Sequence, residues 1–110
     1  MSVSIKSLNH GPVTAGSLGD LVPAVSAGKS VLVKGMRFVN TGSDTTLNVY
    51  FKHDTDTSRR ILPKDTVLPA GYALFDDQEI ALEEDDKIEA QAASGATVDF
   101  VITGIEREVV

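Results

Sequence analysis

The chain has 110 residues, with 16 acidic and 10 basic side chains, a net charge of −6 and no cysteine. This length fits a single domain. Without thiols, the sequence has no disulfide, thiolate metal site or cysteine nucleophile. Nonspecific nucleic-acid binding rests on clustered Lys and Arg, and a membrane-spanning helix needs about 18 apolar residues in a row. We therefore expect neither a nucleic acid nor a membrane as a partner.

The N-terminal part of the chain predicts one short strand and a long covering loop. Val3, Ile5 and Leu8 indicate a short strand, and His10-Gly11-Pro12 ends it because proline lacks a backbone donor. Residues 13–29 are rich in Gly, Ser, Ala and Pro. This composition is typical of a loop with room for one short edge strand.

The next segment predicts the best hairpin in the sequence. Residues 30–40 (SVLVKGMRFVN) form a strand with a bulge at Gly35, where the apolar alternation changes parity. Residues 40–44 form a turn, because Asn, Asp and Gly tolerate positive φ and Asn and Asp cap their own backbone. Residues 47–51 alternate cleanly between apolar and polar. We predict that the two strands pair around this turn.

Short, interrupted strands are expected after the hairpin. Residues 53–58 (HDTDTS) are entirely polar and predict an exposed loop. The extended pieces at 60–63 and 66–69 each end in a proline, so edge positions suit them.

Residues 75–93 could form a helix or two strands, since they are rich in the helix formers Glu, Ala and Gln. In a helix, the residues one turn after Ile80 and Leu82 would all be acidic, which breaks any apolar stripe. Two strands around an acidic turn at 83–86 keep the apolar residues on inner faces, and strands are favoured. A final strand follows at 98–105.

Short strands with a turn signal every eight to twelve residues predict an all-β fold. We expect an antiparallel β-sandwich, of jelly-roll or immunoglobulin-like type, or a small barrel. Within this single domain, residues 1–29 form the N-terminal strand and arm, and residues 30–110 form the β-domain.

No catalytic motif is recognisable. The chain has no G-x-S-x-G elbow, no H-E-x-x-H and no phosphate-binding G-x-x-x-x-G-K, and its run of acids on a tight turn is not the pocketed carboxylate pair of general acid–base catalysis. We therefore predict a protein that is not an enzyme and needs no cofactor.

Acids near His53 and in the acidic turn are the best metal candidates. An H-D-x-D run could bring a ring nitrogen and a carboxylate to one cation, and the acidic turn offers oxygen ligands for calcium. The spacing matches no calcium-binding loop, so an exposed loop and a solvated acidic face are favoured and no metal site is predicted. The weak candidates are Asp54, Asp56, Glu84 and Asp86.

Two groups of residues are candidates for contacts with other subunits. The loop-like arm carries apolar side chains that require burial, and two adjacent arginines beside the polar loop could meet acids of a neighbouring copy. The interface candidates are Val13, Leu18, Leu21, Val22, Val25, Arg59 and Arg60.

The strand pattern resembles a known family. The runs VLVKGMRFVNTGSDTTLNVYFK, ILPKDTVLPAGYALF and IALEEDDKIEAQAASGATVDFVITGIE, within residues 31–106, are similar to the small all-β accessory proteins of tailed-phage virions. The sequence departs from that family at Asp85, where the pattern usually has glycine. The matching positions are Asn40-Thr41, Leu68-Pro69-Ala70-Gly71, Leu82, Asp86, Ile88, Ala90, Ala92, Val98, Phe100, Ile102, Gly104 and Glu106.

The resemblance implies a structural role in a virion assembled in the host cytoplasm. The implied function is that of a capsid decoration or accessory protein, bound to the major capsid protein or another virion protein. We also expect a homo-oligomer, a trimer or a dimer, because a small domain gains holding strength when several weak contacts act together. The alternatives are a tail- or fibre-associated virion protein, or a host-surface or carbohydrate-binding β-module that would use Tyr50, Tyr72 or the acidic cluster.

Overall fold

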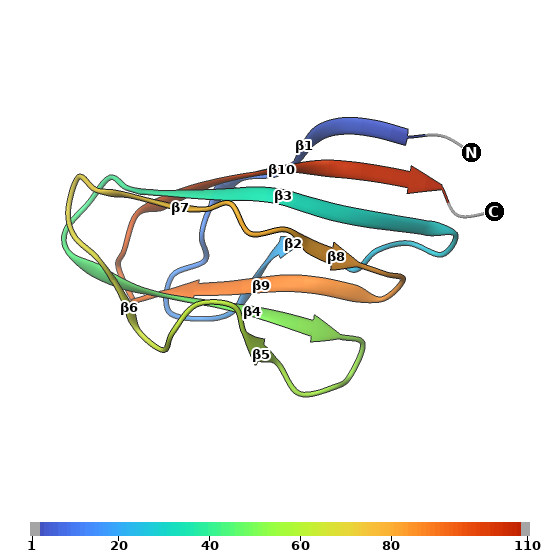
Figure 1. The fold of residues 1–110 in the computed structure, drawn as a ribbon. Helices are drawn as coiled ribbons and strands as arrows, with labels where there is room; N and C mark the ends of the chain where they lie inside the picture. The colour runs from blue at the N-terminus through green and yellow to red at the C-terminus, as the bar shows by residue number, and fades with distance from the viewer. Residues whose placement is uncertain (1–2, 109–110) are drawn as a thin grey trace.

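The computed structural model describes residues 3–108, which form two antiparallel β-sheets stacked face to face (Figure 1). The first sheet contains β1 (Val3–Pro12), β10 (Val98–Glu108), β3 (Lys29–Asn40), and β7 (Ala73–Asp76) and β8 (Ile80–Leu82) along one edge. The second sheet contains β2 (Gly19–Val22), β9 (Asp86–Ala92), β4 (Thr45–His53), and β5 (Arg59–Arg60) and β6 (Thr66–Leu68) along one edge.

The strand pairing is that of a jelly roll. β7 and β8 both pair with β3, and β5 and β6 both pair with β4, so each couple acts as one interrupted strand. The first strand then pairs with the last, β1 with β10, and the second with the next to last, β2 with β9. A long antiparallel ribbon rolled up in this way gives the two Greek keys of a jelly roll. The predicted all-β antiparallel sandwich is confirmed.

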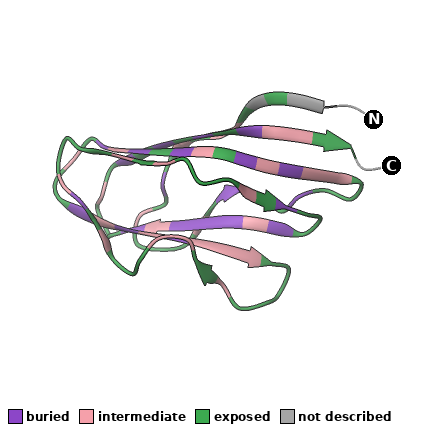
Figure 2. Cartoon of the chain, in the orientation of Figure 1, coloured by how far each residue is buried: buried purple, intermediate pink, exposed green. Residues whose placement is uncertain are grey.

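Buried residues occur along the strands of both sheets (Figure 2), and their apolar side chains form one core cluster. Residues 75–93 form strands rather than a helix, as predicted, and Ile88, Ala90 and Ala92 of β9 all face inward. The prolines also act as expected, because β5 and β6 are short strands on the edge beyond β4. The largest fully buried apolar side chains are Phe38, Leu21, Leu47, Leu82, Ile88 and Ile102.

The hairpin predicted from residues 30–51 is wrong. β3 lies in the first sheet and β4 in the second, so the turn between them crosses from one sheet to the other. The turn chemistry itself is confirmed, because the Asn40 side-chain oxygen accepts a hydrogen bond from Gly42 N–H at 2.9 Å. A turn between two strands with alternating apolar and polar residues is compatible with a hairpin and equally with a connection between two sheets. The choice depends on pairing with β10 and β9, which are distant in the sequence.

The N-terminal arm is an integral part of the sandwich. β1 pairs with β10 along its length and β2 pairs with β9, so residues before 30 contribute a strand to each sheet. Four of the five apolar interface candidates in the arm, Val13, Leu21, Val22 and Val25, are at most 5% exposed within the domain's own core. Their prediction as contacts with another subunit is therefore wrong. The prediction failed because small residues surround these positions and give the segment the composition of a loop. Its apolar side chains nevertheless pack between the sheets. Leu18 is 46% exposed.

The bulge predicted at Gly35 is confirmed. Gly35 pairs with Thr103 and Val33 with Gly104, so Lys34 is the extra residue on β3. Gly104 lies where the two backbones approach closely, because a Cβ on this residue would lie 2.2 Å from the carbonyl oxygen of Leu32.

We expect Gly104→Ala to destabilise the fold by about 1–3 kcal/mol, the usual cost of forcing an extra carbon into a packed site. Gly35→Ala is the matched control, because its added Cβ would have no neighbour nearer than 3.7 Å, an ordinary contact. Urea unfolding monitored by circular dichroism measures both variants. Equal midpoints for the two alanine variants would contradict the close approach at Gly104.

Candidate interaction surfaces

The outer face of the first sheet carries two rows of cross-strand neighbours, one apolar throughout and one in which His10 and Arg37 alternate with apolar side chains. In one row, His10, Val101, Arg37 and Phe75 are successive cross-strand neighbours on β1, β10, β3 and β7. In the other row, Ile5, Ile105, Leu32 and Ala81 occupy the corresponding places on β1, β10, β3 and β8. We call this surface the apolar face.

Alternation along the strands places these side chains outward. On β10, Phe100 and Ile102 are buried, and Val101 between them points away from the core. Ile5 is 87% exposed, Phe75 64% and Val101 43%. Large apolar side chains are therefore exposed on three different strands of one sheet face.

Arg37 lies at the middle of the apolar face. Its guanidinium carbon is 5.1 Å from the centre of the Phe75 ring, a distance suited to a cation–π contact. A shallow depression of about 370 Å³ opens here, between Arg37, Phe75 and Val101, and Asp76 and Asp77 also line it. The depression combines an aromatic and an aliphatic wall with charges of both signs.

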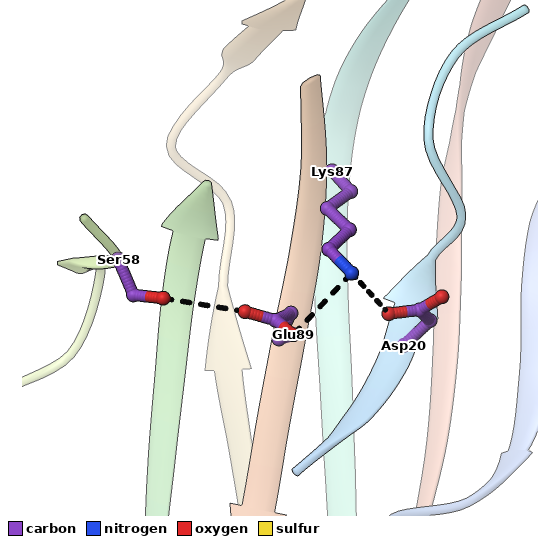
Figure 3. A network of polar contacts seen from close by, with 4 residues as sticks. All are labelled: Asp20, Ser58, Lys87 and Glu89. Carbon is purple, nitrogen blue, oxygen red and sulfur yellow. Dashed lines mark hydrogen bonds and ion pairs between the residues drawn. The ribbon is translucent and has the colours of Figure 1, made fainter. Parts of the chain in front are cut away.

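On the second sheet, four polar side chains of β2, β9 and the loop before β5 form a network of hydrogen bonds and ion pairs (Figure 3). Lys87 Nζ lies 3.2 Å from Asp20 Oδ1 on β2 and 3.4 Å from Glu89 Oε2 on β9. Ser58 Oγ donates a hydrogen bond to Glu89 Oε1 at 3.3 Å. The hydrogen bond to Asp20, with a smaller contribution from Glu89, raises the pKa of Lys87 above its ordinary value. This network compensates the burial of Glu89 and ties β2 to β9.

Arg59 and Arg60 form β5 at the edge of the second sheet, and both are exposed. The Arg60 guanidinium lies 5.0 Å from the centre of the Tyr50 ring and donates to Asn48 Oδ1 at 2.6 Å. Tyr50 lies on β4 of the second sheet, and Tyr72 lies in the turn before β7 of the first sheet. The two tyrosines therefore belong to different sheets.

Among the weak metal candidates Asp54, Asp56, Glu84 and Asp86, the side chain of Asp86 holds two turns together. Asp86 Oδ1 pairs with His53 Nδ1, and Asp86 Oδ2 accepts a hydrogen bond from Glu83 N–H at 2.9 Å. The backbone N–H of Asp54 donates to the carbonyl of Asp85 at 2.9 Å. In the described segment, no three His, Asp or Glu side chains converge to hold a metal ion. The same segment contains no helix long and apolar enough to cross a membrane.

Asp85 adopts the backbone conformation that glycine favours. Its φ is 69°, and aspartate tolerates this left-handed region better than most residues. The residue that departs from the phage-protein pattern therefore still makes the expected turn.

The pair of His53 and Asp86 makes stability depend on pH. The hydrogen bond to Asp86 is the main cause that raises the pKa of His53 above its ordinary value of 6.5, and the charges of Asp56 and Asp54 add to it. The folded state therefore binds this proton more tightly than the unfolded state does. The stabilisation is fully present below about pH 6.5 and is lost as the pH rises through the folded pKa.

We expect the stability difference between the wild type and His53→Gln to shrink as the pH rises from about 6 to 9. The effect is modest, because half of the His53 side chain is exposed. Urea unfolding of both proteins at a series of pH values measures it. A difference that stays constant over this range would show that the pair does not titrate as described.

Comparisons with known proteins show the fold. No protein-family model and no curated protein matches the sequence. A solved structure reported as "Bacillus endospore appendages form a novel family of disulfide-linked pili" matches with a TM-score of 0.61 at 11% sequence identity, over 99% of this chain and 90% of that one. At this identity the likeness concerns the architecture of the sandwich.

Sequence reasoning missed the apolar face. Val101 and Ile105 stand out of phase with the buried residues of the last strand, and this second apolar series along VDFVITGIE was the available signal. Phe75 gave less indication, since it stands in a strand of only four residues that is followed by the polar run Asp77-Gln78-Glu79. The predicted Arg59 and Arg60 remain exposed candidates, and neither forms an ion pair with another residue of segment 3–108.

Proposed function

We propose that this protein is a structural subunit of a protein assembly, and that the assembly is a tailed-phage virion. In this proposal it is an accessory protein of the head, without catalytic activity, that contacts the major capsid protein or another virion protein. The observation that carries the proposal is the apolar face, with Ile5, Val101 and Phe75 exposed on one sheet. The resemblance of residues 31–106 to phage accessory proteins supplies the kind of assembly.

An apolar surface spread over several strands favours a protein contact. A contiguous apolar patch on a small domain commonly marks an interaction site, and covering one large apolar side chain is worth about 1.5–3 kcal/mol. Jelly-roll domains occur in viral capsids and also in lectins and cupins, so the topology supports a virion role by analogy.

A second candidate is a subunit of a filamentous appendage, either a tail- or head-associated fibre or a pilus. The likeness of the fold to the endospore pilus protein favours it. Because this chain has no cysteine, its copies would have to associate without the disulfide links described for that protein.

The proposal can be tested on purified particles of the phage or prophage that carries the gene. We expect mass spectrometry of purified virions to detect the protein, and electron cryomicroscopy to show it at regular sites on the head. Its presence only in filaments or tails would favour the second candidate. Absence from every purified particle and filament would overturn both.

A further inference from the structure

We infer that the apolar face is the interface between two copies of this chain, which pack sheet on sheet about a two-fold axis. The inference rests on the proposed function and deepens it: the assembly contact made by the apolar face is with a second copy, and the contact with another virion protein lies on a different surface of the dimer. Such an interface uses the same patch on both copies, so the patch must complement itself in shape and in charge.

The two rows supply the contact area. Each row crosses four strands, and the rows lie on either side of the bulge where Gly35 faces Thr103. Gly35 and Thr103 are small where they face each other, and Lys34, the extra residue of the bulge, is exposed beside them and pairs with Glu79. Phe75 and Val101 supply the apolar contacts to a second copy. Stacked sheets pack about 10 Å apart through such side chains.

The face carries charges of both signs, with Asp76, Asp77 and Asp99 around Arg37. Arg37 stands at the middle, Asp99 lies two residues before Val101 on β10, and Asp77 lines the same depression. Within residues 3–108, none of these three side chains forms an ion pair. About a two-fold axis, each Arg37 can meet a carboxylate of the other copy, so that one kind of contact is made twice.

Part of the acidic charge lies away from this face. The loop at 53–58 connects β4 and β5 of the second sheet. The acidic turn at 83–86 connects β8 and β9, and Glu83 of this turn lines a depression beside the apolar face, with Leu32, Ala81 and Ile105. On the second sheet, by contrast, Lys87 is already paired with Asp20 and Glu89, and covering that face would desolvate satisfied charges.

Sedimentation velocity of the full-length protein, over micromolar to near-millimolar concentrations, tests the inference. We expect the wild type to dimerise. The dimer dissociation constant of the double variant Phe75→Ser with Val101→Ser should be at least about 30-fold higher, which is the usual effect of losing interface hot spots. Arg37→Glu is expected to weaken the dimer as well. Because all three side chains point outward, circular dichroism should show that these variants remain folded.

The matched control is the double variant Val67→Ser with Tyr72→Ser. These side chains are 68% and 64% exposed, similar to the tested pair, and lie off the apolar face. The control is expected to dimerise like the wild type. A wild type that stays monomeric at all concentrations, or a control that dissociates as readily as the tested pair, would overturn the inference.

The two proposals fail separately. A monomer that is still found on virion heads would overturn the inference and leave the proposed function in place. A dimer that is disrupted as described, but is absent from all particles and filaments, would overturn the proposed function.

Discussion

A chain that lacks residues 1–25 will not fold. The deletion removes β1, which pairs with β10 from residue 3 to residue 12, and β2, which pairs with β9. It also removes four side chains of the core, Val13, Leu21, Val22 and Val25. At about 1.5–3 kcal/mol each, their burial is comparable to the whole stability of a small domain, about 5–15 kcal/mol. In addition, β10 in one sheet and β9 in the other would each lose a neighbouring strand and become an exposed edge.

Far-ultraviolet circular dichroism and calorimetry of residues 26–110 measure this outcome. We expect a spectrum without the sheet signal of the full chain and no cooperative unfolding transition. Leu18→Ser in the full-length protein is the control, since this exposed position in the same segment should change stability by no more than about 0.5 kcal/mol. A deletion variant that melts cooperatively would show that residues 30–110 form a domain by themselves.

Local features of the fold could be predicted from the sequence because local physics determines them. The bulge at Gly35 follows from a change of parity within one strand, and the edge positions of β5 and β6 follow from nearby prolines. The strands around the acidic turn follow from the absence of an apolar helical stripe. Each of these inferences needed only neighbours in the sequence.

The sheet to which each strand belongs could not be predicted in this way. β3 and β4, like β8 and β9, are consecutive and joined by good turns, yet the members of each couple lie in different sheets. Their partners are β10 for β3 and β9 for β4, which are tens of residues away. Alternation shows which side of a strand is apolar but does not show which strand lies beside it.

The apolar face illustrates the same limit. Val101 and Phe75 are adjacent to Arg37 only because β10 and β7 lie on opposite sides of β3. In the sequence they are 26 positions apart and look like isolated apolar residues. A surface assembled from separate strands becomes visible only when the pairing is known.

Asn40 is the polar centre at which the inter-sheet turn is fixed. Its side chain is 1% exposed, and its amide nitrogen donates to the carbonyls of Ser43 at 2.7 Å and Leu68 at 2.9 Å. Its amide oxygen accepts from Gly42 N–H at 2.9 Å. One buried side chain thus joins the β3–β4 turn to the end of β6. Both the nitrogen and the oxygen of its amide form hydrogen bonds with the protein.

Asn40→Asp will therefore destabilise the protein by about 3–5 kcal/mol at neutral pH. The shape is unchanged, but a carboxylate cannot donate to the two carbonyls, which are left unpaired beside a buried negative charge. Only the protonated acid can donate, so the folded state raises the pKa of the new group and binds its proton more tightly than the unfolded state does. The loss is then smallest in acid and grows as the pH rises through that pKa.

Urea unfolding of the wild type, Asn40→Asp and Asn40→Ala between about pH 3 and 8 separates the charge from the lost hydrogen bonds. The alanine variant also leaves both carbonyls without a donor, at about 1–3 kcal/mol for each, but it adds no titrating group. Its loss relative to the wild type should therefore stay constant with pH, whereas that of the aspartate variant increases. Parallel pH profiles for the two variants would show that residue 40 reaches solvent, and that the inter-sheet turn does not depend on a buried amide.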